Sequence, residues 1–202
     1  MAEKTGIAWC DSTFNPWIGC TRVGPGCDNC YAAEQDSRKR WDGGRLHWGP
    51  GVPRYRTSVA NWELPVRWNK KAAASGKPHR VFCASLADVF DNEVSAQWRS
   101  DLFRLICDTP HLTWLLLTKR IGNVTEMARG AVLPNAWIGA TIVNQEEWDR
   151  DAEKLLRLRG FGKRFVSYEP ALGLVNWALA GTAPKSWGFG YVPIGELLNW
   201  II

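Results

Sequence analysis

Short apolar runs rich in β-branched and aromatic residues alternate along the chain with longer stretches of helical periodicity. The runs predict strands at 6–9, 80–84, 113–118, 136–141, 164–168 and 197–202. The stretches between them predict helices at 31–40, 95–108, 124–130 and 145–158, with a short one at 175–179. Ser95 and Asn144 are expected to cap two of these helices, because each stands just ahead of a periodic apolar pattern.

This alternation predicts an α/β fold. Nearly continuous apolar strands separated by helices favour a parallel sheet covered by helices. Six strand–helix units fall short of the eight in a complete barrel, so we predict a partial parallel (β/α)6 barrel. At 202 residues the chain is long enough for one sizeable core, and we expect a single domain over 1–202.

The region 41–79 departs from the pattern. It is rich in Gly, Pro, Trp and Arg, and we interpret it as an insertion after the first helix. A loop of this length inside a compact domain is usually functional or disordered. Its tryptophans argue against disorder, because they supply apolar surface to bury.

Polar residues follow the predicted strands. Ser85 and Asp88 come after the second strand, Lys119 after the third, Thr141 at the end of the fourth and Glu169 after the fifth. The carboxyl ends of parallel strands share one edge of a sheet, where α/β folds build their binding sites. These five residues are therefore candidate binding residues. Capping of strand ends or ion pairing within the fold is the alternative role for each.

Three cysteines near the N-terminus suggest a metal centre. Cys20, Cys27 and Cys30 follow the spacing C-x6-C-x2-C, and the Gly-Pro-Gly run at 24–26 makes the segment a loop. Such a loop can fold three thiolates onto one centre. Three thiolates with no obvious fourth ligand suit a [4Fe–4S] cluster that keeps one iron open, whereas a closed structural zinc site takes four ligands.

The remaining cysteines leave an alternative open. Cys83 lies in an apolar strand and Cys107 in an amphipathic helix, and both are expected to be small buried hydrophobic residues. Cys10 ends the first predicted strand and is a candidate fourth ligand. Four cysteines would favour zinc or a closed, electron-transfer cluster. None of the three histidines follows a metal-ligand spacing.

Charge and composition add a location and a partner surface. No run approaches the roughly 18 apolar residues of a membrane span, and the N-terminus lacks the apolar segment of a signal peptide, so we expect a cytoplasmic protein. The net charge of +5 is uneven, with +6 in residues 1–80 and −1 in residues 81–202. Arginines, lysines and tryptophans interleave over 38–71, a pattern that suits nucleic acid or a host protein. Tryptophans that pin a loop to the core and a solvated basic surface are the alternatives.

Six segments, spanning nearly the whole chain, resemble a phage and bacterial protein family with a radical-SAM-like three-cysteine motif. More broadly they are similar to the radical S-adenosylmethionine (SAM) superfamily. The segments are 5–20 (TGIAWCDSTFNPWIGC), 26–32 (GCDNCYA), 85–90 (SLADVF), 115–120 (LLLTKR), 137–141 (WIGAT) and 166–170 (VSYEP).

The resemblance implies a radical SAM-type enzyme acting on an unknown substrate. The three cysteines would bind a [4Fe–4S] cluster whose open iron chelates SAM, and one electron would release a 5′-deoxyadenosyl radical. It also implies residue roles. Ser85 and Asp88 would receive the SAM amino group, Thr141 and Glu169 the ribose hydroxyls, and Lys119 or its neighbour Arg120 the SAM carboxylate or an anionic substrate.

This sequence differs from the superfamily pattern in two respects. The commonest loop is C-x3-C-x2-C, whereas the first gap here is six residues. Relatives continue past the last strand with a glycine-rich turn, so the resemblance implies a C-terminally truncated chain. The alternative function is a phage-encoded binding protein in the host cytoplasm. It would keep a cluster or zinc for structure and grip nucleic acid or a host protein through 38–71.

Overall fold

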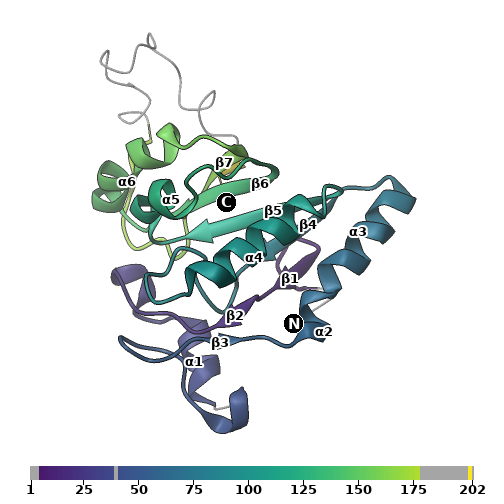
Figure 1. Cartoon of the computed structure of the whole chain (residues 1–202). Helices are drawn as coiled ribbons and strands as arrows, with labels where there is room; N and C mark the ends of the chain where they lie inside the picture. Colours follow the sequence, from purple (N-terminus) through teal and green to yellow (C-terminus); the bar gives the residue numbers. More distant parts are fainter. Residues whose placement is uncertain (1–4, 39–40, 178–199, 202) are drawn as a thin grey trace.

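The computed structural model describes residues 5–38, 41–177 and 200–201, which form an α/β fold built on a parallel sheet (Figure 1). The order of strands in this sheet is β1-β4-β5-β6-β7-β8, and every neighbouring pair is parallel. Its strands are β1 (Ser12–Phe14), β4 (His79–Cys83), β5 (Leu112–Thr118), β6 (Leu133–Thr141), β7 (Phe161–Ser167) and β8 (Trp200–Ile201). A separate antiparallel pair joins β2 (Trp17–Ile18) to β3 (Tyr55–Arg56).

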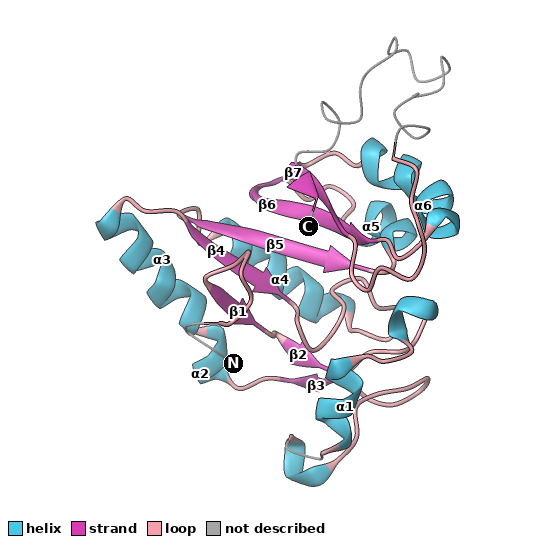
Figure 2. Cartoon of the chain, turned by 180° about the vertical axis from the view of Figure 1, so that it is seen from behind, coloured by secondary structure: helices cyan, strands magenta, loops and turns pink. Residues whose placement is uncertain are grey.

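Helices follow the strands, as a parallel sheet requires. They are α1 (Tyr31–Ser37), α2 (Val59–Trp62), α3 (Leu64–Ser75), α4 (Ala96–Cys107), α5 (Ile121–Met127) and α6 (Gln145–Arg157). Figure 1 shows α4 in front of the sheet, and Figure 2, seen from behind, shows the sheet in front of α4. No described helix is long and apolar enough to cross a membrane.

Alternation along the strands divides the apolar residues between two faces. Val81, Trp114 and Ile138 belong to the main core, which also includes apolar residues of α3, α4 and α6. Their strand neighbours Phe82 and Leu115 belong to a smaller cluster on the opposite face. Because successive side chains of a strand point to opposite faces, one face packs under the helices and the other is left to line a cavity.

The structure confirms the parallel α/β class and most of the predicted elements. The four predicted strands from 80–84 to 164–168 correspond to β4, β5, β6 and β7, and the helix predictions at 31–40, 95–108, 124–130 and 145–158 correspond to α1, α4, α5 and α6. The side chain of Asn144 caps α6 by accepting from the amide of Glu147 at 2.9 Å. Ser95 holds the N-cap position of α4, but its side chain makes no capping hydrogen bond.

The first strand was predicted at the wrong place. Residues 6–9 form a bend and a turn, and the strand that pairs with β4 is β1, three residues beyond Trp9. The apolar side chain of Trp9 packs on Phe82, with 4.6 Å between ring centroids, and so contributes to the core without being part of a strand. The buried residues of β1 are Ser12, Thr13 and Phe14, so polar side chains hid the real strand from an apolar pattern.

The region 41–79 is more regular than its composition suggested. It holds β3, α2 and α3, and α3 packs on β4 and β5 as a crossover helix between β1 and β4. Trp68 of α3 is buried in the main core. At the C-terminal end, residues 175–177 are not helical, while 178–179 of that predicted helix and most of the predicted strand 197–202 lie outside the described residues.

Candidate functional site

A cavity of about 800 Å³ lies where the carboxyl ends of the parallel strands meet. One wall is the cysteine loop, which we define as residues 20–30. The opposite wall comes from the ends of β4, β5, β6 and β7 and the turns after them. Apolar side chains that include Ile7, Trp9, Phe82 and Leu117 cover much of the surface. The cavity therefore lies on the face of the sheet that the helices leave free.

All eight residues predicted as ligands or binding residues line this one cavity: Cys20, Cys27, Cys30, Ser85, Asp88, Lys119, Thr141 and Glu169. Arg120 lines it too. These residues are spread over most of the chain length, so their meeting is a product of the fold. The expectation that polar residues after successive strands would gather at one edge of the sheet agrees with their positions in the structure.

Glycines let the cysteine loop lie close to the end of β6. A Cβ atom built on Gly26 would stand 2.8 Å from Cγ1 of Val143 and 3.3 Å from Cε of Lys119. A Cβ on Gly24 would stand 3.1 Å from a carboxylate oxygen of Glu147. Since Val143 is fully buried and β-branched, it cannot move aside easily. The two glycines of the Gly-Pro-Gly run thus allow the cysteine loop to approach Val143 and Glu147 closely, in addition to letting the backbone turn.

The three cysteines of the loop differ in environment. Cys20 is buried, while Cys27 and Cys30 are half-buried. Burial, with help from the nearby Asp88 carboxylate, raises the pKa of the Cys20 thiol to about 12, although Arg120 opposes the shift. A thiol with this pKa holds its proton at neutral pH until a metal or another cation replaces it.

The other cysteines lie away from the lining of the cavity. Cys10, the candidate fourth ligand, is buried in the smaller apolar cluster with Phe82 and does not line the cavity. Cys83 is fully buried, as predicted. Cys107 is exposed at the end of α4, so the prediction of a buried residue was wrong there.

Asp88 is the most heavily hydrogen-bonded residue of the predicted set. Its carboxylate accepts from the Thr118 hydroxyl at 2.8 and 2.9 Å, from the Lys119 amide at 3.1 Å and from the Phe90 amide at 2.9 Å. Nη1 of Arg120 donates to it at 3.2 Å. Asp88 thus ties the end of β4 to the end of β5, which is the internal role held open for it as an alternative.

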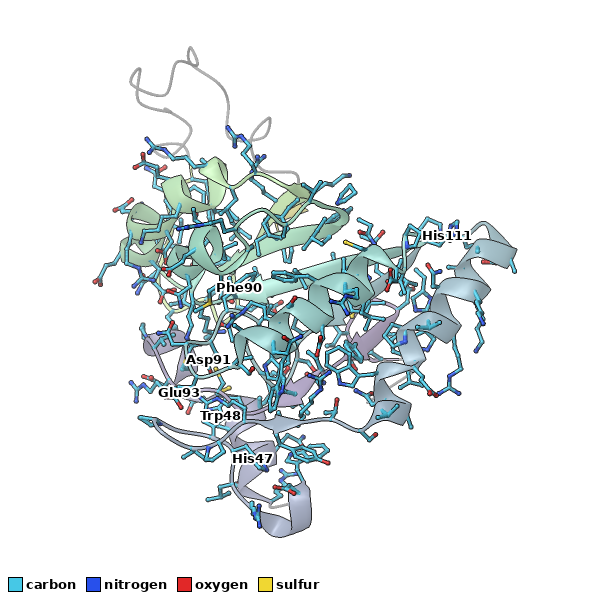
Figure 3. The ribbon with its side chains drawn as sticks, in the orientation of Figure 1. His47, Trp48, Phe90, Asp91, Glu93 and His111 are labelled. Carbon is cyan, nitrogen blue, oxygen red and sulfur yellow. The ribbon has the colours of Figure 1, made fainter. Side chains whose placement is uncertain are left out.

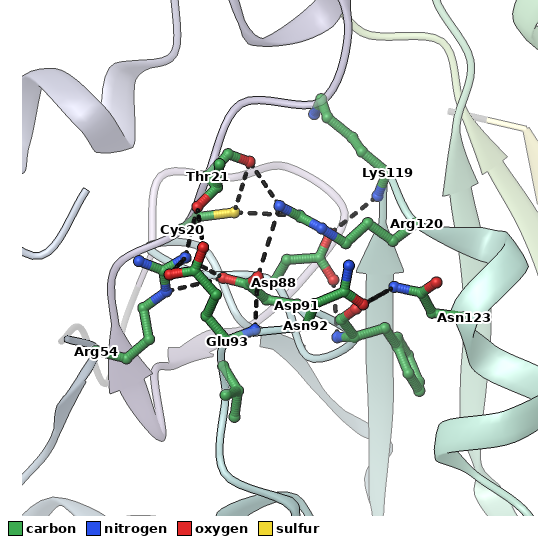
Figure 4. Close-up of polar contacts among 12 residues, drawn as sticks. Cys20, Thr21, Arg54, Asp88, Asp91, Asn92, Glu93, Lys119, Arg120 and Asn123 are labelled. Carbon is green, nitrogen blue, oxygen red and sulfur yellow. Dashed lines mark hydrogen bonds and ion pairs between the residues drawn. The ribbon is translucent and has the colours of Figure 1, made fainter. Parts of the chain in front are cut away.

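Two arginines and three acidic residues form a charged network beneath the cysteine loop (Figure 4). Arg120 contacts Asp88 at 3.2 Å and Asp91 at 3.7 Å, while Arg54 contacts Asp91 at 2.8 Å and Glu93 at 3.2 Å. Burial alone would lower the pKa of the Arg120 guanidinium, but Asp88, Cys20 and Asp91 more than offset it and raise the pKa. Arg120 therefore stays charged in a nearly water-free setting.

The same two arginines hold the start of the cysteine loop. Nη2 of Arg120 donates to the Thr21 carbonyl at 2.6 Å, and Nη1 donates to Sγ of Cys20 at 3.3 Å. Nη2 of Arg54 donates to the Thr21 hydroxyl at 2.6 Å. Thr21, the residue after Cys20, is therefore held through its carbonyl by Arg120 and through its hydroxyl by Arg54, both in charge-assisted hydrogen bonds.

Asn15 joins three segments around the site and is almost fully buried. Its side-chain amide donates to Oγ of Ser85 at 3.0 Å and accepts from the Leu86 amide at 2.7 Å. Its backbone carbonyl accepts from Thr57 at 2.9 Å and Asn61 at 3.0 Å. Ser85 is thus held by Asn15, and the turn after β4 is linked to α2.

Lys119, Thr141 and Glu169 are the polar lining residues best placed to meet a ligand. Nζ of Lys119 lies 3.4 Å from the hydroxyl of Thr141, a weak contact that a bound anion can replace. Glu169 is exposed on the cavity wall and has no hydrogen-bond or ion-pair partner within the described part of the chain. A weakly bonded ammonium group and a carboxylate with no partner among the described residues therefore face the same space.

The donor set fits a cluster bound by three thiolates, with apolar walls and a buried arginine beside the innermost cysteine. Within the described ranges, no three Cys, His, Asp or Glu side chains are already close enough to hold a metal ion. Binding therefore requires the thiols to draw together from their places around the wall. Lys119, Thr141 and Glu169 remain free to meet a second ligand.

Two arginines and two tryptophans of the basic segment 38–71 are engaged in the fold, while Arg45, Arg67 and Lys70 are exposed. Arg54 is buried in the charged network, and Arg56 stacks on Trp62, with its guanidinium carbon 4.4 Å from the ring centroid, while pairing with Asp101. Trp68 is buried in the main core. These contacts agree with the alternative that the tryptophans pin this region to the core.

The histidines do not converge on the site. Figure 3 shows His47 low in the view and His111 at its upper right, far from each other. His79 begins β4 and lies 3.0 Å from the hydroxyl of Ser12.

Sequence reasoning missed Asn15, Arg54 and Asp91, which support the site from below. The signal for Asn15 was its place before Pro16 in a largely apolar run, where a buried amide must satisfy its hydrogen bonds. Arg54 and Asp91 gave no local signal, because their pairing spans 37 positions.

The model of one protein family matches residues 4–202, and that family is described as “Protein of unknown function (DUF5131)”. Because the match covers nearly the whole chain, the chain belongs to this family. No curated protein and no solved structure matches the chain.

Proposed function

We propose that this member of the DUF5131 family is an iron–sulfur protein of the radical SAM type, with a [4Fe–4S] cluster bound by Cys20, Cys27 and Cys30. One observation carries the proposal: three cysteines and five polar residues, selected from the sequence alone, line a single cavity at the carboxyl ends of parallel strands. That edge is where parallel α/β folds place their chemistry.

When bound, the cluster would supply the electron and the open iron for reductive cleavage of SAM. The chain itself would bind, orient and shield. Ile7, Trp9, Phe82 and Leu117 give the cavity apolar walls, which would shield a bound ligand from water. Exclusion of water strengthens the electrostatic contacts of a bound ligand and protects reactive species from side reactions.

The polar lining residues would orient SAM. Lys119 suits its carboxylate, since within the described part of the chain its ammonium group has only the weak Thr141 contact to give up. Asp88 was expected at the SAM amino group, but its carboxylate already accepts from four partners, Arg120 among them. In this proposal Glu169 is the more accessible carboxylate for that ammonium, and Asp88 supports the site through Arg120.

The proposal extends to the finer architecture. The strand order follows the chain order through β4, β5, β6, β7 and β8, each step parallel. A progressive parallel order with the cavity on the helix-free face supports a partial (β/α)6 barrel whose interior is the binding site. A cluster of this kind also needs a reducing compartment, which supports a cytoplasmic location.

Anaerobic reconstitution tests the proposal directly. The protein is incubated with iron and sulfide, desalted, and assayed for iron, sulfide and zinc together with its ultraviolet–visible spectrum. We expect about four iron and four sulfide ions per chain. Addition of SAM and dithionite should then release 5′-deoxyadenosine, detected by chromatography.

Other results would assign the site differently. A full cluster without SAM binding or cleavage would reject the radical chemistry and leave an electron-transfer or structural centre. Stoichiometric zinc with no iron uptake would favour the binding-protein alternative. In that alternative the partner would meet the exposed basic residues of 38–71, such as Arg45, Arg67 and Lys70, because Arg54, Arg56, Trp62 and Trp68 are engaged in internal contacts.

A further inference from the structure

We propose that Arg120 is a positioning residue that holds Cys20 as a ligand and raises the midpoint potential of the bound cluster. The inference rests on the proposed function, because it concerns the same cluster. It adds a role that the sequence did not predict, since the resemblance placed Arg120 only at the SAM carboxylate or an anionic substrate.

The guanidinium of Arg120 grips two adjacent residues at once. Nη1 donates to Sγ of Cys20 at 3.3 Å, and Nη2 donates to the carbonyl of Thr21 at 2.6 Å. The planar fork of an arginine fixes the direction of both bonds, which a flexible ammonium group would not do. Cys20 is therefore held in a set orientation before any metal arrives.

Arg120 is itself held in place from the other side. Its side chain is 7% exposed, and it contacts Asp88 at 3.2 Å and Asp91 at 3.7 Å. Asp91 is shared with Arg54, which donates to it at 2.8 Å. Because each acidic partner is anchored in turn, the guanidinium cannot swing away from the sulfur without breaking its ion pair with the buried Asp88 carboxylate (Figure 4).

The three cysteines are not equivalent in this respect. Across the described residues, Arg120 is the one cation in hydrogen-bond contact with Sγ of Cys20, and no such contact is found at Cys27 or Cys30. Hydrogen bonds and positive charge at a ligating sulfur stabilise the more negative, reduced state of a cluster. The expected consequence is a higher midpoint potential than the same cluster would have without Arg120.

The test is a redox titration of the reconstituted cluster in Arg120→Gln, Arg120→Lys and a matched control. Arg22→Gln removes the same charge from a residue that also lines the cavity but is exposed and paired with Asp28. Arg120→Gln should lower the midpoint potential, Arg120→Lys should lower it less, and Arg22→Gln should shift it least because solvent screens an exposed charge.

Two further variants keep the inference testable if Arg120→Gln folds poorly. Arg120→Gln combined with Asp88→Asn should have a lower potential than Asp88→Asn alone, because these two variants differ only in the cation that donates to Cys20. Asp88→Asn alone keeps Arg120 and removes a negative charge, so it should raise the potential. Opposite shifts in Asp88→Asn and in Arg120→Gln are not expected from a purely structural role.

The outcomes separate this inference from the proposed function. Equal potentials in wild type and in fully iron-loaded Arg120 variants would overturn the role of Arg120 while leaving the cluster in place. A shift in Arg22→Gln as large as that in Arg120→Gln would overturn it too, because the effect would then be general charge. A wild-type protein that takes up no iron would overturn the proposed function and this inference together.

Discussion

Nε of Arg54 lies 2.8 Å from a carboxylate oxygen of Asp91 in a pair that is almost closed to water, with side chains 1% and 2% exposed. Arg54 comes from the segment before β3 and Asp91 from the loop between β4 and α4. The pair joins the region 41–79 to the loop after the second parallel strand. It therefore fixes the position of Arg54, which in turn holds Thr21 at the start of the cysteine loop.

The first prediction is that this pair is costly to break. Asp91→Asn leaves Arg54 and Arg120 without a shared negative partner in a buried setting, and we expect a loss of about 3–5 kcal/mol in the free energy of unfolding. Urea denaturation of the metal-free protein measures it. Glu153→Gln breaks an exposed pair with Arg157 on α6 and should change the free energy by less than about 1 kcal/mol. Similar losses in the two variants would contradict the prediction.

The second prediction concerns the ligands of the proposed cluster. Replacing Cys20, Cys27 or Cys30 with alanine should bring iron content and visible absorbance after reconstitution close to background, because three thiolates are the full protein ligand set. Cys107→Ala is the matched control, since that thiol is exposed at the end of α4 and should not alter iron binding. Full cluster content in any single variant of the three would exclude that cysteine as a ligand.

The third prediction tests the close packing of the cysteine loop. In Gly26→Ala the new methyl group would meet Cγ1 of Val143 at 2.8 Å, so the loop must shift away from the end of β6. We expect overpacking to cost about 1–3 kcal/mol and reconstituted iron to be lost faster to a chelator. Thermal unfolding and chelator-release kinetics measure the two effects.

A control and a rescue sharpen this prediction. Gly122→Ala, in α5, places its Cβ no closer than 3.9 Å to a neighbouring side chain and should retain iron like the wild type. The double variant Gly26→Ala with Val143→Ala removes the clash, so its loss of stability should be smaller than the sum of the single losses. Strict additivity would show that Val143 is not the obstacle.

The fourth prediction is a loss of stability at alkaline pH that depends on Cys10. Burial raises the pKa of its thiol from 9.0 to about 11. Between these values the unfolded chain has released a proton that the folded chain keeps, so stability falls as pH rises from 9 towards 11. Urea midpoints of the metal-free protein at pH 8 and pH 10.5 should differ less in Cys10→Ser than in wild type. An unchanged difference would mean that the Cys10 thiol titrates normally.

Much of the sheet could be predicted from the sequence because its inner strands are buried on both faces. Residues such as Val81, Phe82, Leu115 and Leu116 form near-continuous apolar runs, and such runs are typical of central parallel strands. α6 was equally clear, since Asn144 caps it and its apolar positions follow a helical period.

The misplaced first strand and the missed helix α3 have physical causes. β1 is three residues long and two of its buried residues, Ser12 and Thr13, are polar. It therefore lacks the apolar pattern by which a buried strand is recognised in a sequence. α3 begins with a proline near its N-terminus, a position where proline is tolerated, and its buried Trp68 and Ala72 stand four residues apart. The composition of the region masked that spacing.

The sequence predicted which residues gather at the candidate site but not which of their side chains pair with one another. Asp88 and Lys119 were selected because they follow strands, and the parallel topology brings strand ends together whatever the side chains do. Which carboxylate pairs with which arginine depends on packing across 30 or more positions, as in the contacts of Asp88 with Thr118 and Arg120. No local pattern encodes such pairings, so the sequence named Asp88 as a ligand-binding residue although the fold uses it internally.

The order in which the chain is synthesised bears on the contact between Arg120 and Cys20, which spans 100 positions. The ribosome adds about 5–20 residues per second, so roughly 5–20 s separate the synthesis of the cysteine from that of the arginine. Val143, against which Gly26 packs, is made later still. During translation the three thiols therefore leave the ribosome with no pocket to receive them, exposed to oxidants and stray metal ions. Loading of the proposed cluster would therefore have to wait until the second half of the chain has been made.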